Sequence, residues 1–414
     1  MEKLIAFVGI FVMLGMGYAL CPKDKRSSIS WRLVFTGILL QFVFAILILK
    51  TAPGKMAFSY ANDLIGQLLD YTKEGSKFIF GDLASADKPS GFIFAFQVLP
   101  TIIFFSSLMS VLYHIGIMQR VVNVVAVIMY KVMGTSGAES LSNAANVFVG
   151  QTEAPLVIKP FLAKLTKSEL LAIMAGGMAN TAGGILAAYV GMFQNSFPEI
   201  AGHLIAASLM SAPASFVFAK IILPETEEPE TKGSVTMTDE KVAANVIDAI
   251  AVGASEGLSL AINVAAMLIA FIAIIAMFNG IIGGIGNLLG FPGVSLQFFM
   301  GYLFAPLAYL MGVPASETLL VGQFLGEKIV LNEFVAYIDM SKNMDNLSAT
   351  SKIVCAYALS GFANLSSIAI QIGGIGALAP ERRGDLSRLG LKAMIAGNFA
   401  SFQTATIAAL LLSI

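Results

Sequence analysis

The chain has 414 residues, of which 57% are hydrophobic and only 12% are charged, with a formal net charge of −1. Soluble domains usually carry about 25% charged residues, so this composition excludes an ordinary soluble protein and predicts a membrane protein. A net charge so close to zero gives no electrostatic footprint for nucleic acid, and no such partner is expected. The apolar runs lack the strict alternation of a transmembrane barrel, which favours an all-α polytopic fold in a lipid bilayer.

Eight transmembrane helices are predicted, in chain order over residues 4–21, 32–50, 91–112, 168–193, 200–222, 257–286, 350–379 and 391–413. Each is close to or above the roughly 20 apolar residues that a spanning helix needs. The amphipathic segments 55–72 and 117–134 are expected to lie along the membrane surface as interfacial helices. The acidic stretch after residue 223 is predicted to be a solvated linker.

The distribution of basic residues predicts the orientation. Lys and Arg gather after the first apolar run and again over residues 120–131, 159–167 and 382–392. The positive-inside rule places these segments in the cytoplasm, so both termini are expected on the outer side. Residues 4–20 have the length of a signal peptide, but Leu20 is large where cleavage requires a small residue. A retained first helix is therefore expected.

Two segments, 139–163 and 317–342, are too polar at their centres to span simply. They resemble each other, because Glu153 in the first corresponds to Glu333 in the second. The helices that follow also match, with Asn180 corresponding to Asn364 at nearly the same separation. Because the first unit enters from inside and the second from outside, we predict an inverted repeat of two re-entrant helical hairpins that meet at the midplane.

Local chemistry explains where the hairpins turn. Pro155 fits the first turn of a helix, so a helix is expected to restart near Glu153 with Thr152 as its N-cap. In the second hairpin Asn332 is the expected N-cap and Glu333 lies in the first turn. A carboxylate inside a bilayer is costly and by default marks a substrate or ion site.

Other polar residues receive simpler interpretations. Glycines near the middle of the fourth and seventh helices favour close helix packing. Asn180 and Asn364 favour a site, because each amide needs partners in a dry region. Glu327 and Lys328 on the outer leg of the second hairpin are expected near water.

Three ordered motifs resemble those of concentrative nucleoside transporters. Residues 142–156 are similar to the first-hairpin motif, residues 332–337 to the second-hairpin motif and residues 361–368 to the helix-7 motif. The resemblance covers essentially the whole chain and implies a bacterial inner-membrane homotrimer without an enzymatic cofactor. It further implies nucleoside uptake coupled to a cation gradient, usually sodium, through a scaffold and a mobile transport domain in each protomer.

The same resemblance implies a division of the chain. Its parts are scaffold helices 1–3 with interfacial helices (1–134), the first hairpin with helices 4–5 (135–223), a cytoplasmic linker (224–256), scaffold helix 6 with an interfacial segment (257–312), and the second hairpin with helices 7–8 (313–414). The two hairpin units would form the transport domain.

Site residues are carried over from the motifs. The implied substrate contacts are Gln151 and Thr152 to the base, Ile185 and Phe362 as apolar walls, Glu333, Asn364 and Ser367 to the ribose, and Glu153 through water. A carboxylate suits ribose hydroxyls, and an amide can both donate to and accept from a base. Uridine serves as the reference substrate, since the motifs do not separate purine from pyrimidine nucleosides.

The implied sodium ligands are Asn146, the Val149 carbonyl, Asn180 and the Thr181 carbonyl. Neutral oxygens from amides and unwound backbone suit a hard cation. The chain departs from the family pattern at Asn180, where a small hydroxyl residue is common. This departure affects the expected identity and affinity of the ion.

Two alternatives remain open from the sequence. The first keeps nucleoside transport but couples it to protons, with Glu153 as the proton carrier. The second is a membrane-embedded hydrolase that uses Ser360 or a carboxylate pair, for which the sequence offers neither a credible base nor a nucleophile elbow.

Overall fold

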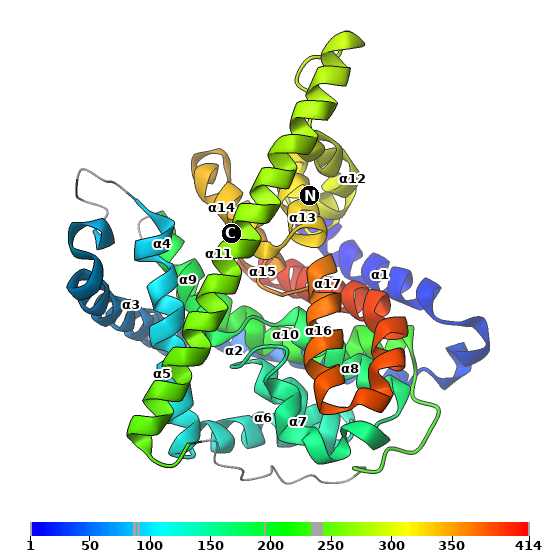
Figure 1. The fold of residues 1–414 in the computed structure, drawn as a ribbon. Coiled ribbons are helices and arrows are strands. Elements are labelled where there is room, and N and C mark those ends of the chain that lie inside the picture. Colours follow the sequence, from blue (N-terminus) through cyan, green and yellow to red (C-terminus); the bar gives the residue numbers. More distant parts are fainter. Residues whose placement is uncertain (1, 86–87, 89–91, 194–195, 233–242, 413–414) are drawn as a thin grey trace.

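The computed structural model describes residues 2–85, 88, 92–193, 196–232 and 243–412. Over these residues the chain is helical and contains no strand (Figure 1). Within the same residues, seven helical segments are long and apolar enough to cross a membrane. These observations confirm the predicted all-α membrane fold.

The N-terminal part consists of long helices joined by short turns. Its elements are α1 (Glu2–Leu20), the 3₁₀ turn η1 (Lys23–Ser28), α2 (Trp31–Leu49), α3 (Ala52–Phe80), η2 (Gly81–Ala84), α4 (Phe94–Gln97), α5 (Leu99–His114) and α6 (Ile117–Met133). Helix α3 is longer than the predicted segment 55–72. Thr51 caps its start through the Gly54 amide, and the amphipathic pattern continues to Phe80. Residue 91, assigned to the third span, lies outside the described residues.

The first repeat contains the elements α7 (Gly137–Asn146), the 3₁₀ helix η3 (Ala154–Lys164), α8 (Lys167–Ala179), α9 (Gly183–Phe193) and α10 (Ile200–Ile222). Capping boxes start α7 at Ser136 and α8 at Thr166, so their first amides are satisfied by side chains. The predicted fourth span is two helices, α8 and α9, because regular hydrogen bonding stops at residues 180–182.

The linker and the sixth span differ from their predicted bounds. Helix α11 (Val246–Leu288) begins within the range assigned to the linker, where Asn245 caps it through the Asp248 amide. The following helix is α12 (Leu296–Leu310). Residues 233–242 of the linker lie outside the described residues. Its earlier part is not simply solvated, because the Thr231 carbonyl accepts the Gly137 amide and Glu230 pairs with Lys164.

The second repeat contains the elements α13 (Thr318–Val330), α14 (Glu333–Lys342), η4 (Met344–Asn346), α15 (Ala349–Ala358), α16 (Leu365–Leu378), η5 (Pro380–Arg382) and α17 (Arg383–Leu412). The predicted seventh span is divided into α15 and α16 at residues 359–364. The last span begins earlier than predicted, at Arg383, and residue 413 lies outside the described residues.

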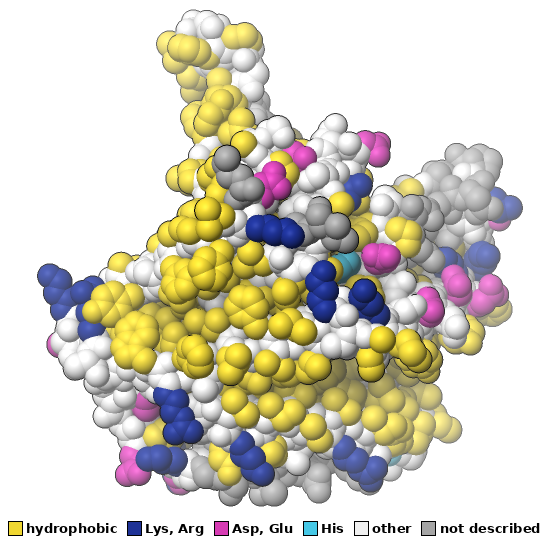
Figure 2. All heavy atoms as spheres, turned by 180° about the vertical axis from the view of Figure 1, so that it is seen from behind, with side chains coloured by type: hydrophobic (Ala, Val, Ile, Leu, Met, Phe, Trp, Pro, Cys, Tyr) yellow, Lys and Arg dark blue, Asp and Glu magenta, His cyan; other side chains and the backbone are white. Residues whose placement is uncertain are grey.

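The helices separate into a buried centre and an exposed frame. Helices α8, α10 and α17 pack on one another, and 89% of the most apolar part of α10 is buried. In α11 the corresponding share is 17%, and Figure 1 shows this long helix crossing one side of the molecule. Figure 2 shows a broad band of hydrophobic side chains on the opposite face, with charged side chains, including Lys and Arg, both above and below it, as expected for a lipid-facing surface.

Candidate functional site

The second hairpin tip presents a buried carboxylate. Asn332 caps α14 by accepting the Val335 amide at 2.9 Å, and Glu333 follows in the first turn, as predicted. Only 5% of Glu333 is exposed. The Tyr189 hydroxyl donates to its Oε1 at 3.1 Å, and the Asn364 amide donates to its Oε2 at 2.9 Å. These two donors compensate for burying the carboxylate.

Asn364 performs a second task at the same place. Its Oδ1 accepts the Ser367 amide at 2.9 Å and the Ser366 hydroxyl at 2.7 Å, which makes it the N-cap of α16. With its oxygen on the helix end, the amide nitrogen is left to face Glu333. The break between α15 and α16 therefore orients the carboxylate of the second hairpin.

The first hairpin tip presents a buried amide. Gln151 donates from Nε2 to the Ser367 hydroxyl at 3.1 Å and accepts from the Gln371 Nε2 at 3.0 Å. Gln371 also donates to the Met174 carbonyl at 2.9 Å, so its own amide is fixed. A Cβ added at Gly177 would lie 2.9 Å from the Gln151 Cβ, so this glycine permits the close packing predicted for it.

The two tips exchange partners between repeats. Gln151 of the first repeat bonds to α16 of the second, whereas Glu333 of the second repeat bonds to Tyr189 on α9 of the first. Four of the predicted site residues are thereby connected in two pairs, Gln151 with Ser367 and Glu333 with Asn364. The sequence predicted the correspondence between the repeats but not this exchange.

The remaining predicted substrate residues lie on the same elements. Ile185 is buried on α9 one turn before Tyr189, and Phe362 is half-buried in the break before α16. Thr152 is half-buried against Gly374 of α16, where the side-chain carbon of Thr152 occupies the space a Cβ would need. Glu153 is exposed, unlike its counterpart Glu333.

One local prediction about the first hairpin is wrong. Thr152 is not an N-cap: the following helix begins at Ala154, and Glu153 stands at the cap position without a side-chain capping bond. Pro155 does lie in the first turn, as expected. Pro160 lies inside this leg and lacks the amide donor that an α-helix needs there, which is consistent with its 3₁₀ form.

Buried oxygen atoms without partners occur at the break between α8 and α9 and at the end of α7, which precedes the first hairpin tip. Asn146, Asn180 and Thr181 are each at most 2% exposed. The Oδ1 atoms of Asn146 and Asn180 and the Thr181 hydroxyl have no hydrogen-bond partner. Asn180 donates its Nδ2 to the Gly176 carbonyl at 3.1 Å, which leaves its oxygen free. Buried polar atoms are normally satisfied, so these three point to a ligand.

The backbone brings the first hairpin to this break. The Phe148 carbonyl accepts the Gly183 amide at 3.1 Å, joining the tip to the start of α9. Val149, whose carbonyl was a predicted ligand, is the next residue and is half-buried. No group of three or more His, Cys, Asp or Glu side chains able to hold a metal occurs in the described residues. The available ligand atoms are amide, hydroxyl and carbonyl oxygens, which suit a hard monovalent cation.

Three residues around the site were missed by sequence reasoning. Tyr189 and Gln371 each lie four residues after a predicted site residue, Ile185 and Ser367, and thus on the same helix face. That spacing was a usable signal. Lys328 was expected near water with Glu327, but both are buried. Its Nζ donates to the Ala358 carbonyl at 2.7 Å, at the end of α15.

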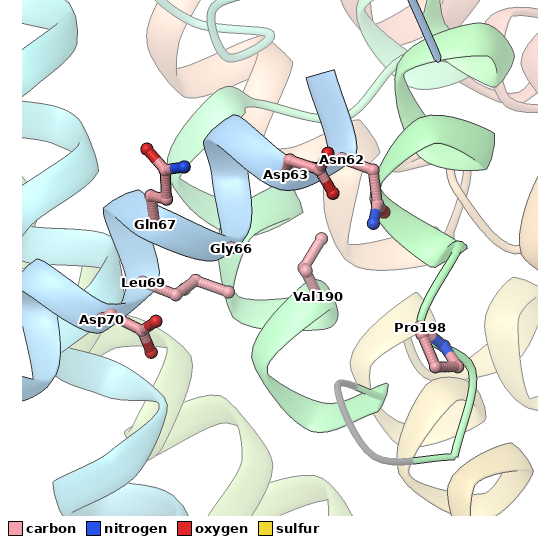
Figure 3. Close-up of a pocket in the computed structure, with 8 residues that line it drawn as sticks. All are labelled: Asn62, Asp63, Gly66, Gln67, Leu69, Asp70, Val190 and Pro198. Atoms are coloured by element: carbon pink, nitrogen blue, oxygen red, sulfur yellow. The ribbon is translucent and has the colours of Figure 1, made fainter. Parts of the chain in front are cut away.

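A cavity of about 440 Å³ lies away from this site, between α3 and the region where α9 leads to α10. Figure 3 shows Leu69 and Val190 directed toward each other across it, with Asp63 and Asp70 along α3. None of the predicted site residues lines it. The site is therefore defined by its hydrogen bonds and unpaired oxygens.

Three family models match nearly all of the chain. They are "Na+ dependent nucleoside transporter N-terminus" over residues 8–83, "Nucleoside recognition" over residues 95–196 and "Na+ dependent nucleoside transporter C-terminus" over residues 203–409. Their order follows the arrangement seen in the structure, since the last covers the second hairpin and both halves of the seventh span.

Relatives match from end to end. An uncharacterized transporter of Haemophilus influenzae is 47% identical over 420 residues, covering 100% of this chain and 99% of that protein. The human sodium/nucleoside cotransporter 1 is 40% identical over 429 residues, which is 99% of this chain but 64% of the human protein.

Solved structures agree with this. The protein CNTnw in an inward-facing, substrate-bound state matches with a TM-score of 0.92 and 43% identity, covering 100% of this chain and 98% of that one. A variant of CNTnw in an outward-facing state matches with a TM-score of 0.94 and the same identity and coverage. The chain therefore belongs to the concentrative nucleoside transporter family, which consists of membrane transporters and not of enzymes.

Proposed function

We propose that this protein is a secondary active symporter that imports uridine-like nucleosides together with sodium by alternating access. The observation that carries the proposal is the pair of polar groups at the two tips. A carboxylate, Glu333, is held by Asn364 and Tyr189, while an amide, Gln151, is held by Ser367 and Gln371.

The carboxylate suits the ribose. An ionised carboxylate offers about four lone-pair positions, and Asn364 and Tyr189 occupy only two of those on Glu333. The remaining positions can accept the two ribose hydroxyls as charge-assisted hydrogen bonds. In this proposal Asn364 and Ser367 complete the ribose contacts, and the exposed Glu153 joins through water.

The amide suits the base. Gln151 can exchange its bonds to Ser367 and Gln371 for bonds to a nucleobase, because an amide both donates and accepts. Thr152 lies beside it in the chain, and Ile185 and Phe362 supply apolar walls. A purine or a pyrimidine presents donors and acceptors to this side of the site.

The sodium ion is proposed to bind at the unpaired oxygens of the first hairpin. Asn146 and Asn180 supply side-chain oxygens, and Val149 and Thr181 supply carbonyls. The free Oδ1 of Asn180 supports this role, since it replaces the hydroxyl oxygen common at this position in the family. The unpaired Thr181 hydroxyl lies at the same break and offers one oxygen that the sequence did not predict.

The proposed setting is the inner membrane of a bacterium. We propose eight spans with two re-entrant hairpins, both termini on the periplasmic side, and a homotrimer whose scaffold includes α11. Large exposed apolar side chains on α11, including Ile262, Ile269 and Phe278, support its contact with lipid or a partner subunit. The two hairpin units would move against that scaffold.

Uptake by reconstituted protein tests the proposal. Purified protein in proteoliposomes is given labelled uridine or adenosine, with and without an inward sodium gradient. The proposal expects concentrative uptake of at least one nucleoside that depends on the gradient, and no uptake of free ribose or free base. Accumulation of a different solute class without nucleoside competition would contradict it.

A further inference from the structure

A chain of polar side chains crosses from α11 to the outer leg of the second hairpin. On α11, Asn279 accepts the Leu296 amide at 2.8 Å and donates to Gln297 of α12 at 2.9 Å. Gln297 in turn lies next to Glu327 of α13. A second amide, Gln323, lies one helical turn before Glu327 on α13 and donates to Asp339 of α14 at 2.5 Å. Glu327 and Asp339 therefore interact electrostatically, and Gln323 lies next to both of them.

This chain lies where two helices pack closely. A Cβ added at Gly322 would lie 2.6 Å from the Gly301 carbonyl oxygen, and one at Gly326 would lie 2.5 Å from the Met300 Cβ. Such contacts leave little room between α12 and α13. Glu327 is accordingly only 1% exposed, and its Oε2 atom is buried without any hydrogen-bond partner.

The surrounding charges do not neutralise Glu327. Helices α12, α14 and α15 pack most closely against α13, and α17 contacts it through Phe402, which lies against Lys328. Helix α12 carries no charged residue, α15 carries Lys352, and α14 carries Glu333, Asp339 and Lys342. Lys342 is exposed and attracts the carboxylates of Glu327 and Asp339 electrostatically. Lys328, on α13 itself, donates to the Ala358 carbonyl. A buried carboxylate without a paired cation is strongly unfavourable unless it is protonated.

We propose that Glu327 and Asp339 form a proton-binding site, in which one proton is held on Glu327 beside the charged Asp339. The arrangement of the amides favours a proton over a metal cation, because Gln323 directs its N–H toward Asp339 and Gln297 uses its oxygen on Asn279. The site is separate from Glu153 and from the nucleoside contacts, so it does not depend on the proposed substrate or coupling ion.

Infrared difference spectroscopy of the purified full-length protein tests this site. Wild-type protein should show the carbonyl-stretch band of a protonated carboxyl group at neutral pH, and the band should disappear as the pH rises. Glu327→Gln should lose that band, whereas Glu381→Gln, which removes an exposed carboxylate, should retain it. Glu327→Gln has the shape of the protonated acid and should remain folded.

A second variant gives an independent outcome. Asp339→Asn removes the negative charge that favours the protonated form, so the pH at which the band disappears should shift downward. An unchanged band in Glu327→Gln would overturn the proposal, as would an unshifted or upward-shifted transition in Asp339→Asn. Loss of the wild-type band on adding sodium at constant pH would identify a metal-cation site instead, which also overturns it.

Discussion

The two hairpins occupy corresponding places in the chain but differ in how their polar groups are satisfied. In the second hairpin a side chain caps α14, and Glu333 is buried with a donor on each oxygen. In the first hairpin the returning leg is a 3₁₀ helix, Glu153 is exposed, and Asn146 is buried without a partner for either amide atom.

This difference supports the proposal of a separate role for each hairpin. A carboxylate already oriented by Asn364 and Tyr189 is prepared for hydroxyl groups and needs little rearrangement. Buried oxygens without partners, as at Asn146 and Asn180, are unfavourable until a ligand supplies positive charge. We therefore propose that ribose is recognised at the second hairpin and that the ion binds at the first, with Gln151 connecting the first hairpin to the base.

The largest expected effect comes from breaking the second hairpin's site. Glu333→Ala removes the acceptor for the ribose and leaves Asn364 and Tyr189 without their shared partner. Losing two charge-assisted bonds should weaken uridine binding by about 3 kcal/mol, roughly a hundredfold or more. Isothermal titration calorimetry with uridine measures this loss.

Asn364→Ala should also weaken uridine binding, because it removes a hydrogen-bond donor to Glu333 and the N-cap of α16 at the same time. Glu381→Gln is the matched control, since it removes an exposed carboxylate far along the chain from either tip. Near-normal uridine affinity in both site variants would remove ribose recognition from the second hairpin.

The next effect concerns the first hairpin. Asn146→Ala and Asn180→Ala each remove one unpaired oxygen from the proposed sodium site. The sodium concentration for half-maximal uridine uptake should rise by roughly tenfold, equivalent to about 1.4 kcal/mol. Uptake rates measured against sodium in proteoliposomes provide the value.

Asn287→Ala controls for the loss of an amide, because Asn287 is exposed on α11. At saturating sodium, both site variants should retain most of their uridine affinity. If uridine affinity fell while the sodium dependence stayed constant, the division of tasks between the hairpins would be reversed.

A smaller effect is expected where the first hairpin meets the base. Gln151→Met keeps the length of the side chain but removes the bonds to Ser367 and Gln371. The preference between uridine and adenosine should change by about 1–2 kcal/mol, whereas the dependence on ribose hydroxyls should remain. Competition by a panel of nucleosides and dideoxynucleosides separates the two. An equal change for every nucleoside would exclude a base contact.

The smallest effect tests the fit of the first hairpin against α16. A Cβ at Gly374 would collide with Thr152, whereas a Cβ at the neighbouring Gly373 would meet nothing within 4 Å. Gly374→Ala should weaken uridine binding by ~1 kcal/mol, about fivefold, and Gly373→Ala should leave it unchanged. Equal affinities in the two variants, by calorimetry, would show that Thr152 does not lie beside the substrate.

Local signals predicted those parts of the fold that local chemistry determines. The bounds of α10, Ile200–Ile222, match the predicted span, because Glu199 precedes this largely apolar segment and Pro224 follows it closely. Asn332 was predicted as a cap because its side chain acts on its own helix. The capping residue of the first hairpin was misassigned because the returning leg begins at Ala154, later than predicted, and is a 3₁₀ helix.

Contacts between the repeats could not be predicted from local sequence patterns. Gln151 and Gln371 are 220 residues apart, and Tyr189 and Glu333 are 144 residues apart. The prediction that Lys328 lies near water was also wrong. A lysine next to a glutamate is normally exposed to solvent, whereas here the end of α15 supplies a carbonyl that accepts its hydrogen bond. Which buried atoms lack partners follows only from three-dimensional packing.

Coupling of nucleoside uptake to sodium is the central claim, and one experiment tests it most directly. Uridine uptake into proteoliposomes is measured while sodium is varied at fixed pH, and then while pH is varied without sodium. We predict uptake that requires an inward sodium gradient and that needs more sodium in Asn146→Ala. Uptake indifferent to sodium, driven by an inward proton gradient and lost in Glu153→Gln, would contradict the sodium assignment and establish Glu153 as the proton carrier.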